Sequence, residues 1–173
     1  MNYSFSITTK KGDEYRIMLI DADISMLAKK VRDIILENNL DISEIMIDRI
    51  SGGESTAQEV LHTITGKVAD LFAINVNLIL YYSCDDMTPI PSRNTNSDNK
   101  NLPVNEYRSR LFTHIFDTYM ASHQISGITN TPIRLDNYVD GMGYSIFIHF
   151  IARTLHDDVI EKLKTEIKEV SGK

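Results

Sequence analysis

The residues best suited to chemistry stand where a mostly apolar segment, residues 76–82, gives way to charge. Two acidic residues follow that segment, and two arginines come at the start of the next segment with helical periodicity. In open sheets that contain parallel strands, ligands bind beyond the carboxyl ends of those strands. Guanidinium groups beside carboxylates at such an end could hold an anionic or peptide ligand. The predicted cluster comprises Tyr82, Cys84, Asp85, Asp86, Arg108 and Arg110.

Two interpretations of this cluster stay open. Arg108 shares a helical stripe with apolar residues, and an isolated buried charge is costly, so we expect it to pair with Asp85 or Asp86. In the first interpretation the pair only fastens the helix to the strand end. In the second, Asp85 is a base or ligand anchor, and Arg108 or Arg110 clamps an anion.

Other residue types give weaker signals. Two aspartates directly after Cys84 oppose formation of a thiolate, so we expect a small buried side chain there. Asp21 and Asp23 have no spacing that is diagnostic of a metal site, and the turn 51–56 lacks the P-loop signature. The histidines show no metal-ligand spacing, and His149 is expected to be a satisfied histidine on a sheet face. The sequence therefore predicts no catalytic residue, metal or cofactor.

A polar segment at about residues 90–102 separates the two halves of the candidate cluster. It is rich in Asn and Ser and contains no large apolar side chain between residues 91 and 101. Long connections within a compact domain tend to be functional or mobile. We therefore expect a partner to contact this loop and the nearby helix, with Arg93, Asp98, Lys100 and His114 as candidate contacts.

The elements that would position these residues follow from hydrophobic periodicity. Alternation predicts an N-terminal hairpin, and three- and four-residue steps predict a helix after Asp23 that stops at Asn38-Asn39. Strands are expected at 44–50 and 76–82, parallel to each other and joined by a helix. A third helix at about 103–121, a second hairpin and a last helix complete the order ββαβαβαββα. We expect one α+β domain over residues 1–173, with four helices and a mixed sheet of about six strands.

Composition narrows the class of protein. The 18 basic and 24 acidic side chains give a net charge of −6, which disfavours a nucleic-acid binder and suits a basic protein partner. A single cysteine excludes an internal disulfide. No apolar segment is long enough to span a bilayer, and the first residues lack the pattern of a signal peptide. We expect a cytoplasmic protein that does not contact a membrane.

Two motifs carry a resemblance to a known family. The segments Tyr82-x-Cys84-Asp85 and Arg108-x-Arg110-Leu111-Phe112 resemble those of a family of short, uncharacterised bacterial proteins. The chain departs from that family in its Asn/Ser-rich insertion and at Ile115-Phe116, where an aromatic pair often stands. The resemblance implies that the cysteine, the aspartate and the two arginines belong together, and it implies no activity.

A second resemblance concerns the order of elements only. From the 44–50 strand onward, the order is similar to the latter half of acetyltransferases that depend on acetyl coenzyme A. Those enzymes bind pyrophosphate with an Arg/Gln-x-x-Gly-x-Gly/Ala loop before the second helix. Residues 51–56 of this chain lack the arginine and the spaced glycines.

The leading hypothesis is an acidic protein-interaction module of the immunity, antitoxin or accessory kind, without its own catalysis. The alternative is an enzyme or small-ligand sensor with an anion-binding pocket at the end of the 76–82 strand. A third hypothesis is homo-oligomerisation through an outer strand of the N-terminal hairpin.

Overall fold

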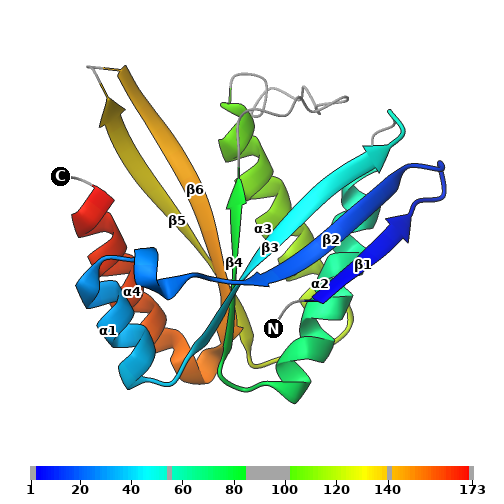
Figure 1. The fold of residues 1–173 in the computed structure, drawn as a ribbon. Helices are drawn as coiled ribbons and strands as arrows, with labels where there is room; N and C mark the ends of the chain where they lie inside the picture. The colour runs from blue at the N-terminus through cyan, green and yellow to red at the C-terminus, as the bar shows by residue number, and fades with distance from the viewer. Residues whose placement is uncertain (1–2, 54–55, 85–101, 140–141, 172–173) are drawn as a thin grey trace.

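The computed structural model describes residues 3–53, 56–84, 102–139 and 142–171. The predicted order of elements is confirmed, with two short 3₁₀ turns added (Figure 1). The strands are β1 (Tyr3–Thr8), β2 (Glu14–Asp21), β3 (Asp41–Ser51), β4 (Leu78–Cys84), β5 (Ile128–Val139) and β6 (Met142–Arg153). The helices are α1 (Lys29–Glu37), α2 (Ala57–Ile74), α3 (Val104–Ser122) and α4 (Asp157–Ser171).

The six strands form one mixed sheet in the order β1-β2-β3-β4-β6-β5. As expected, β3 and β4 run parallel and every other neighbouring pair is antiparallel. The apolar run that predicted a central strand is β4, in which Ile79 and Leu80 are fully buried. A strand that is covered on both faces needs such a run.

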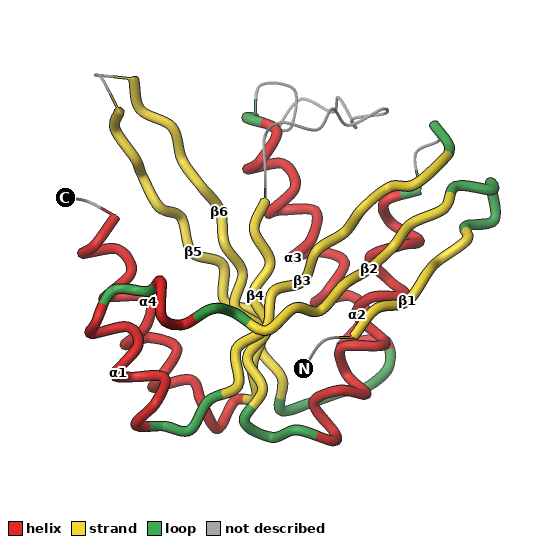
Figure 2. The backbone as a smooth tube through the Cα atoms, viewed as in Figure 1, coloured by secondary structure: helices red, strands yellow, loops and turns green. Residues whose placement is uncertain are grey.

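Helices cover the sheet on both faces, as Figure 2 shows. Helices α2 and α3 pack on one face, where Phe72 and Phe112 join the larger apolar core. Helices α1 and α4 pack on the other face, where Ile35 and Leu163 join a second core. Alternate residues of β4 contribute to the two cores, which places this strand at the centre of the molecule.

The helix predicted to follow Asp23 begins later than expected. Ile24–Met26 form a 3₁₀ turn, and α1 starts only at Lys29. The Asp23 carboxylate accepts a hydrogen bond from the Ser25 amide at 3.0 Å, so it caps the short turn and not the α-helix. The predicted stop is confirmed, because Asn39 adopts a positive φ of 49° directly after the helix.

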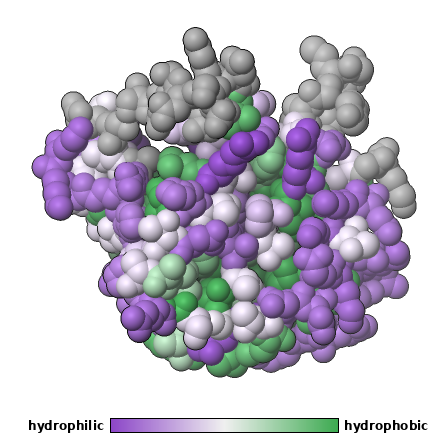
Figure 3. All heavy atoms as spheres, turned by 180° about the vertical axis from the view of Figure 1, so that it is seen from behind, coloured by the Kyte–Doolittle hydropathy of each residue, from purple (hydrophilic) through white to green (hydrophobic). Residues whose placement is uncertain are grey.

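The surface behind the sheet mixes polar and apolar side chains (Figure 3). Three large apolar residues are exposed at or after the ends of two elements. They are Ile74 at the end of α2, Val76 two residues later, and Leu155 just before α4. No described helix is long and apolar enough to cross a membrane.

Candidate functional site

The pairing between the two parallel strands stops well before either strand ends. Asp41–Glu44 of β3 pair with Leu78–Tyr81 of β4, but β3 continues to Ser51 and β4 to Cys84. Beyond Glu44 the strands diverge, with β3 leaning toward β2 and β4 toward β6 (Figure 1). We call this opening the β3–β4 fork, and its β3 side is the inner edge from Ile45 to Asp48. Among the described strands, none pairs with that inner edge.

A β-bulge accompanies the divergence of β3. Tyr15 of β2 pairs with Arg49, and the preceding residue Glu14 pairs with Ser51, so Ile50 is an extra residue in β3. Bulges bend a strand and increase its local twist. The bulge therefore bends the last residues of β3, beyond the Ile45–Asp48 edge that lines the fork.

The closed end of the fork is marked by a contact between its two strands. The Tyr81 hydroxyl donates a hydrogen bond to the Glu44 carboxylate at 2.9 Å, and these residues are the last pair of the ladder. Burial, followed by the hydrogen bond and charge of Glu44, raises the pKa of Tyr81 to about 12. The phenol therefore stays a neutral donor at physiological pH.

A buried charged cluster holds the β3 side of the fork. Asp13, only 1% exposed, pairs with the Arg49 guanidinium at 2.9 Å and accepts a hydrogen bond from the Thr56 hydroxyl at 2.5 Å. Because the Thr56 proton is used in this way, the Tyr15 hydroxyl donates to the Thr56 oxygen at 3.0 Å. The Arg49 guanidinium also lies 5.5 Å from the centre of the Tyr15 ring. The cluster fastens the N-terminal hairpin and β3 to the start of α2.

Gly52 makes room for this cluster. Its φ is +98°, and a Cβ at this position would lie 1.7 Å from the Asp13 Oδ1 atom. A Cβ at the next residue, Gly53, would meet nothing within 4 Å. The glycine pair that the sequence suggested as a turn thus contains one glycine that the charged cluster requires.

A second, uncharged cluster holds the β4 side of the fork. His149 of β6 is fully buried, and its Nε2 atom lies 2.9 Å from the Ser109 hydroxyl of α3. Its Nδ1 atom lies 2.9 Å from the Asn130 carboxamide oxygen of β5. An amide oxygen only accepts, so Nδ1 carries the proton and Nε2 accepts from the serine. Burial lowers the pKa of His149 to about 4, which keeps the ring neutral near pH 7.

Aromatic rings extend this uncharged cluster to β4. Tyr82 lies opposite His149 in the ladder between β4 and β6. The Phe112 ring of α3 is 5.0 Å from the Tyr82 ring and 4.9 Å from the His149 ring, centre to centre. The expected satisfied histidine on a sheet face is therefore present, although a helix covers it completely.

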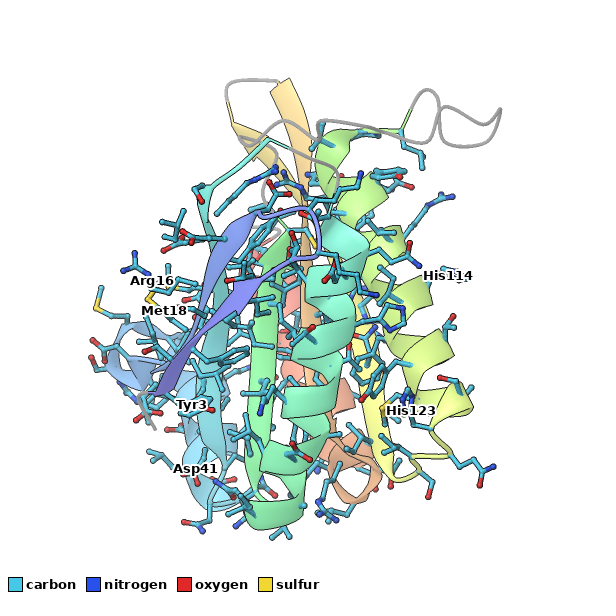
Figure 4. The ribbon with its side chains drawn as sticks, turned by 90° about the vertical axis from the view of Figure 1, so that its right-hand side faces the viewer. Tyr3, Arg16, Met18, Asp41, His114 and His123 are labelled. Carbon is cyan, nitrogen blue, oxygen red and sulfur yellow. The ribbon has the colours of Figure 1, made fainter. Side chains whose placement is uncertain are left out.

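The structure locates part of the predicted cluster. Tyr82 is partly buried beside the fork, Cys84 is buried opposite Phe147, and Arg108 is partly buried on α3. Arg110 is exposed and pairs with Glu106 one turn earlier at 2.8 Å. His114 is exposed on α3 and points away from the sheet (Figure 4).

Five predicted residues lie outside the described residues, and with them the expected pairing of Arg108. They are Asp85, Asp86, Arg93, Asp98 and Lys100. The grouping of Cys84 with the two arginines, and the role of the polar loop, therefore stay predictions.

The sequence did not indicate the fork or its charged anchor. Asp13 has the composition of a turn residue, and its partners lie 36 and 43 positions away at Arg49 and Thr56. The one signal was Gly52, because a glycine after a strand often marks a special backbone conformation. Comparisons of the chain with protein-family models, with curated proteins and with solved structures gave no match.

Proposed function

We propose that this protein is an interaction module without catalysis of its own, which binds an extended segment of a partner protein in the β3–β4 fork. The observation that carries the proposal is the end of the β3–β4 ladder at Glu44 and Tyr81, while β3 continues as a strand to Ser51. A strand edge presents backbone donors and acceptors in a regular row. Extended peptides recognise such edges by adding a strand to the sheet.

The side chains along the fork favour a segment with alternating character. Ile45 and Ile47 belong to the core under α2 and α3, so a bound segment would meet apolar side chains on that face. On the opposite face β3 presents Met46, which is 37% exposed, and the partly buried Asp48. We expect apolar residues of the partner to alternate with polar ones, and a basic residue to lie near Asp48.

Charge supports a basic partner segment. The whole chain carries a net charge of −6. Near the fork, the Asp48 carboxylate makes an exposed contact with Arg16 at 3.4 Å. Exposed ion pairs of this kind contribute little stability, so a partner cation could replace the arginine at small cost. The attraction should weaken as the salt concentration rises.

A second candidate function is binding of an acyl coenzyme A, either for transfer or for sensing. The order of strands and helices from β3 onward favours it, because it resembles that of acetyl-coenzyme-A-dependent acetyltransferases. The coenzyme has an extended arm with amide groups, which could pair with a strand edge as a peptide does. The absence of the pyrophosphate-binding pattern at residues 51–56 argues against it.

The test is a selection of random displayed peptides on the purified protein, followed by titration of the enriched peptides by calorimetry. Met46→Lys places a charge on the fork, and we expect it to weaken peptide binding at least about tenfold. The matched control is Met18→Lys, because Met18 pairs with Met46 on the neighbouring strand and lies one strand further from the fork. Figure 4 shows Met18 at the surface of the sheet.

Three outcomes separate the candidates. Enriched peptides that lose affinity in Met46→Lys and keep it in Met18→Lys support the proposal. Saturable binding of acetyl coenzyme A that is weakened by Met46→Lys and unchanged by Met18→Lys would favour the second candidate instead. Peptides whose affinity is unchanged by Met46→Lys, or no enrichment at all, would contradict binding in the fork.

A further inference from the structure

The two outer strands of the sheet differ in how their edges are protected. β5 contains Pro132, which cannot donate a ladder hydrogen bond, and the exposed ion pair of Arg134 with Asp136. β1 has the sequence Tyr-Ser-Phe-Ser-Ile-Thr, with neither a proline nor a charged residue. Natural proteins use prolines and charges on edge strands to block pairing with other chains. The β5 edge has such protection, whereas the β1 edge has none.

The β1 edge is also uncovered within the described part of the chain. β1 pairs with β2 on one side and is the terminal strand of the sheet on the other. In Figure 1 it is the outermost strand on the right, with no element beyond it. Tyr3 is 40% exposed at its start, and its ring packs against the Phe5 ring at 5.7 Å.

We propose that β1 pairs with β1 of a second copy of this chain in antiparallel orientation, so that two sheets join into one. The pattern of β1 is complementary to itself about a two-fold axis perpendicular to the sheet. Pairing centred on Phe5 places this ring opposite the same ring of the second copy. It also places Tyr3 opposite Ile7 and Ser4 opposite Ser6. Apolar residues thus meet apolar residues on the face toward α2, and small hydroxyl residues meet on the other face.

The hairpin turn selects this register. Thr9 is already part of the turn, since its amide donates to the Asp13 carbonyl at 2.9 Å and its carbonyl accepts from the Gly12 amide at 2.9 Å. A pairing shifted by one residue toward the turn would place Thr9 opposite Tyr3. In the register centred on Phe5, the pairs from Tyr3 to Ile7 all lie within β1, and none of them uses a residue of the turn.

Charge affects this association differently from the proposed binding in the fork. β1 carries no charge, so no like charges meet across the new pair of strands. Each copy has a net charge of −6, and the two copies repel each other at long range. Screening by salt should therefore strengthen self-association, whereas it should weaken the capture of a basic segment.

Sedimentation velocity over a range of protein concentrations tests the proposal. We expect a reversible monomer–dimer equilibrium for the unaltered chain. In Ser4→Lys/Ser6→Lys each lysine meets a lysine of the second copy, and two repulsive cross-strand pairs should weaken the dimer about tenfold or more. Both serines are exposed, so the substitutions should leave the fold intact, as circular dichroism and thermal unfolding can verify.

The matched control is Ser4→Lys/Ser6→Glu. In the register centred on Phe5 each lysine then meets a glutamate of the second copy, and the dimer should persist. A monomeric unaltered chain at high concentration and high salt would overturn the proposal, as would a dimer unaffected by the two lysines. Equal dissociation of the two variants would overturn the proposed register.

Discussion

The two sides of the β3–β4 fork are held by buried polar clusters of opposite chemistry. On the β3 side, Asp13 and Arg49 form an ion pair at the start of α2. On the β4 side, neutral His149 links Ser109 of α3 with Asn130 of β5. Both clusters bring together buried polar side chains from distant parts of the chain. The difference lies in what should disrupt each cluster. A side chain at position 52 should disrupt the charged cluster, whereas protonation of His149 should disrupt the neutral one.

The comparison indicates how the β3–β4 fork stays open. Two parallel strands that diverge give up backbone hydrogen bonds, so each strand needs other contacts to hold its position. The charged cluster ties β3 to α2 and the hairpin turn, while the uncharged cluster ties β6, the neighbour of β4, to α3. Such tertiary contacts replace the missing ladder. Each side should therefore respond to its own kind of perturbation.

The largest effect is expected from Gly52→Ala. The new Cβ would clash with the Asp13 carboxylate and break the buried ion pair, which costs about 3–5 kcal/mol when one partner is lost. The positive φ adds about 1 kcal/mol for a residue with a side chain. Urea unfolding should show this loss, whereas Gly53→Ala should change the free energy of unfolding by less than about 1 kcal/mol. Equal losses in the two variants would refute the role given to Gly52.

The next effect is the pH dependence that His149 confers. Its pKa is about 4 in the folded protein and 6.5 in the reference state, so the unfolded chain binds the proton first as the pH falls. The contribution of neutral His149 to the free energy of unfolding is therefore complete above pH 6.5. About 3 kcal/mol of it is lost as the pH falls from 6.5 through 4. Unfolding at a series of pH values should show that His149→Gln lacks this loss. The control His114→Gln, at an exposed position, should retain it; an unchanged slope in His149→Gln would contradict the assignment.

A smaller effect is expected from Ser109→Ala. The change leaves the buried Nε2 atom of His149 without its hydrogen-bond donor, which costs about 1–2 kcal/mol. Ser122 on the same helix is exposed, donates to the Tyr119 carbonyl and lies 3.0 Å from the His123 Nδ1 atom. Both contacts are at the surface, so Ser122→Ala should change stability by less than about 0.5 kcal/mol. If thermal and urea unfolding find no difference between these variants, the serine does not support the histidine.

The order of elements could be predicted because each element carries its own periodicity. The alternating residues of β1 and β2 and the apolar run of β4 indicate their strands without reference to the rest of the chain. The start of α1 could not be predicted, because Asp23 is an equally good cap for a 3₁₀ turn and for an α-helix. Local patterns do not distinguish these two outcomes.

The candidate site depended on information that local patterns do not contain. The fork is defined by the end of the β3–β4 ladder at Glu44 and Tyr81, while the β2–β3 ladder continues past that point. The alternation of β3 would be the same with or without that divergence. In the same way, the spacing around His149 indicated one buried face, but its partners come from α3 and β5.

Amide hydrogen exchange along β3 tests the central proposal most directly. In the protein alone, we expect the amides that face the fork within Ile45–Asp48 to exchange faster than those of Asp41–Glu44, which lie in the paired part of the strand. A selected peptide should slow exchange in the first segment and leave the second unchanged. Equal and slow exchange of both segments before any peptide is added, or protection that appears elsewhere in the molecule, would contradict the fork as the binding site.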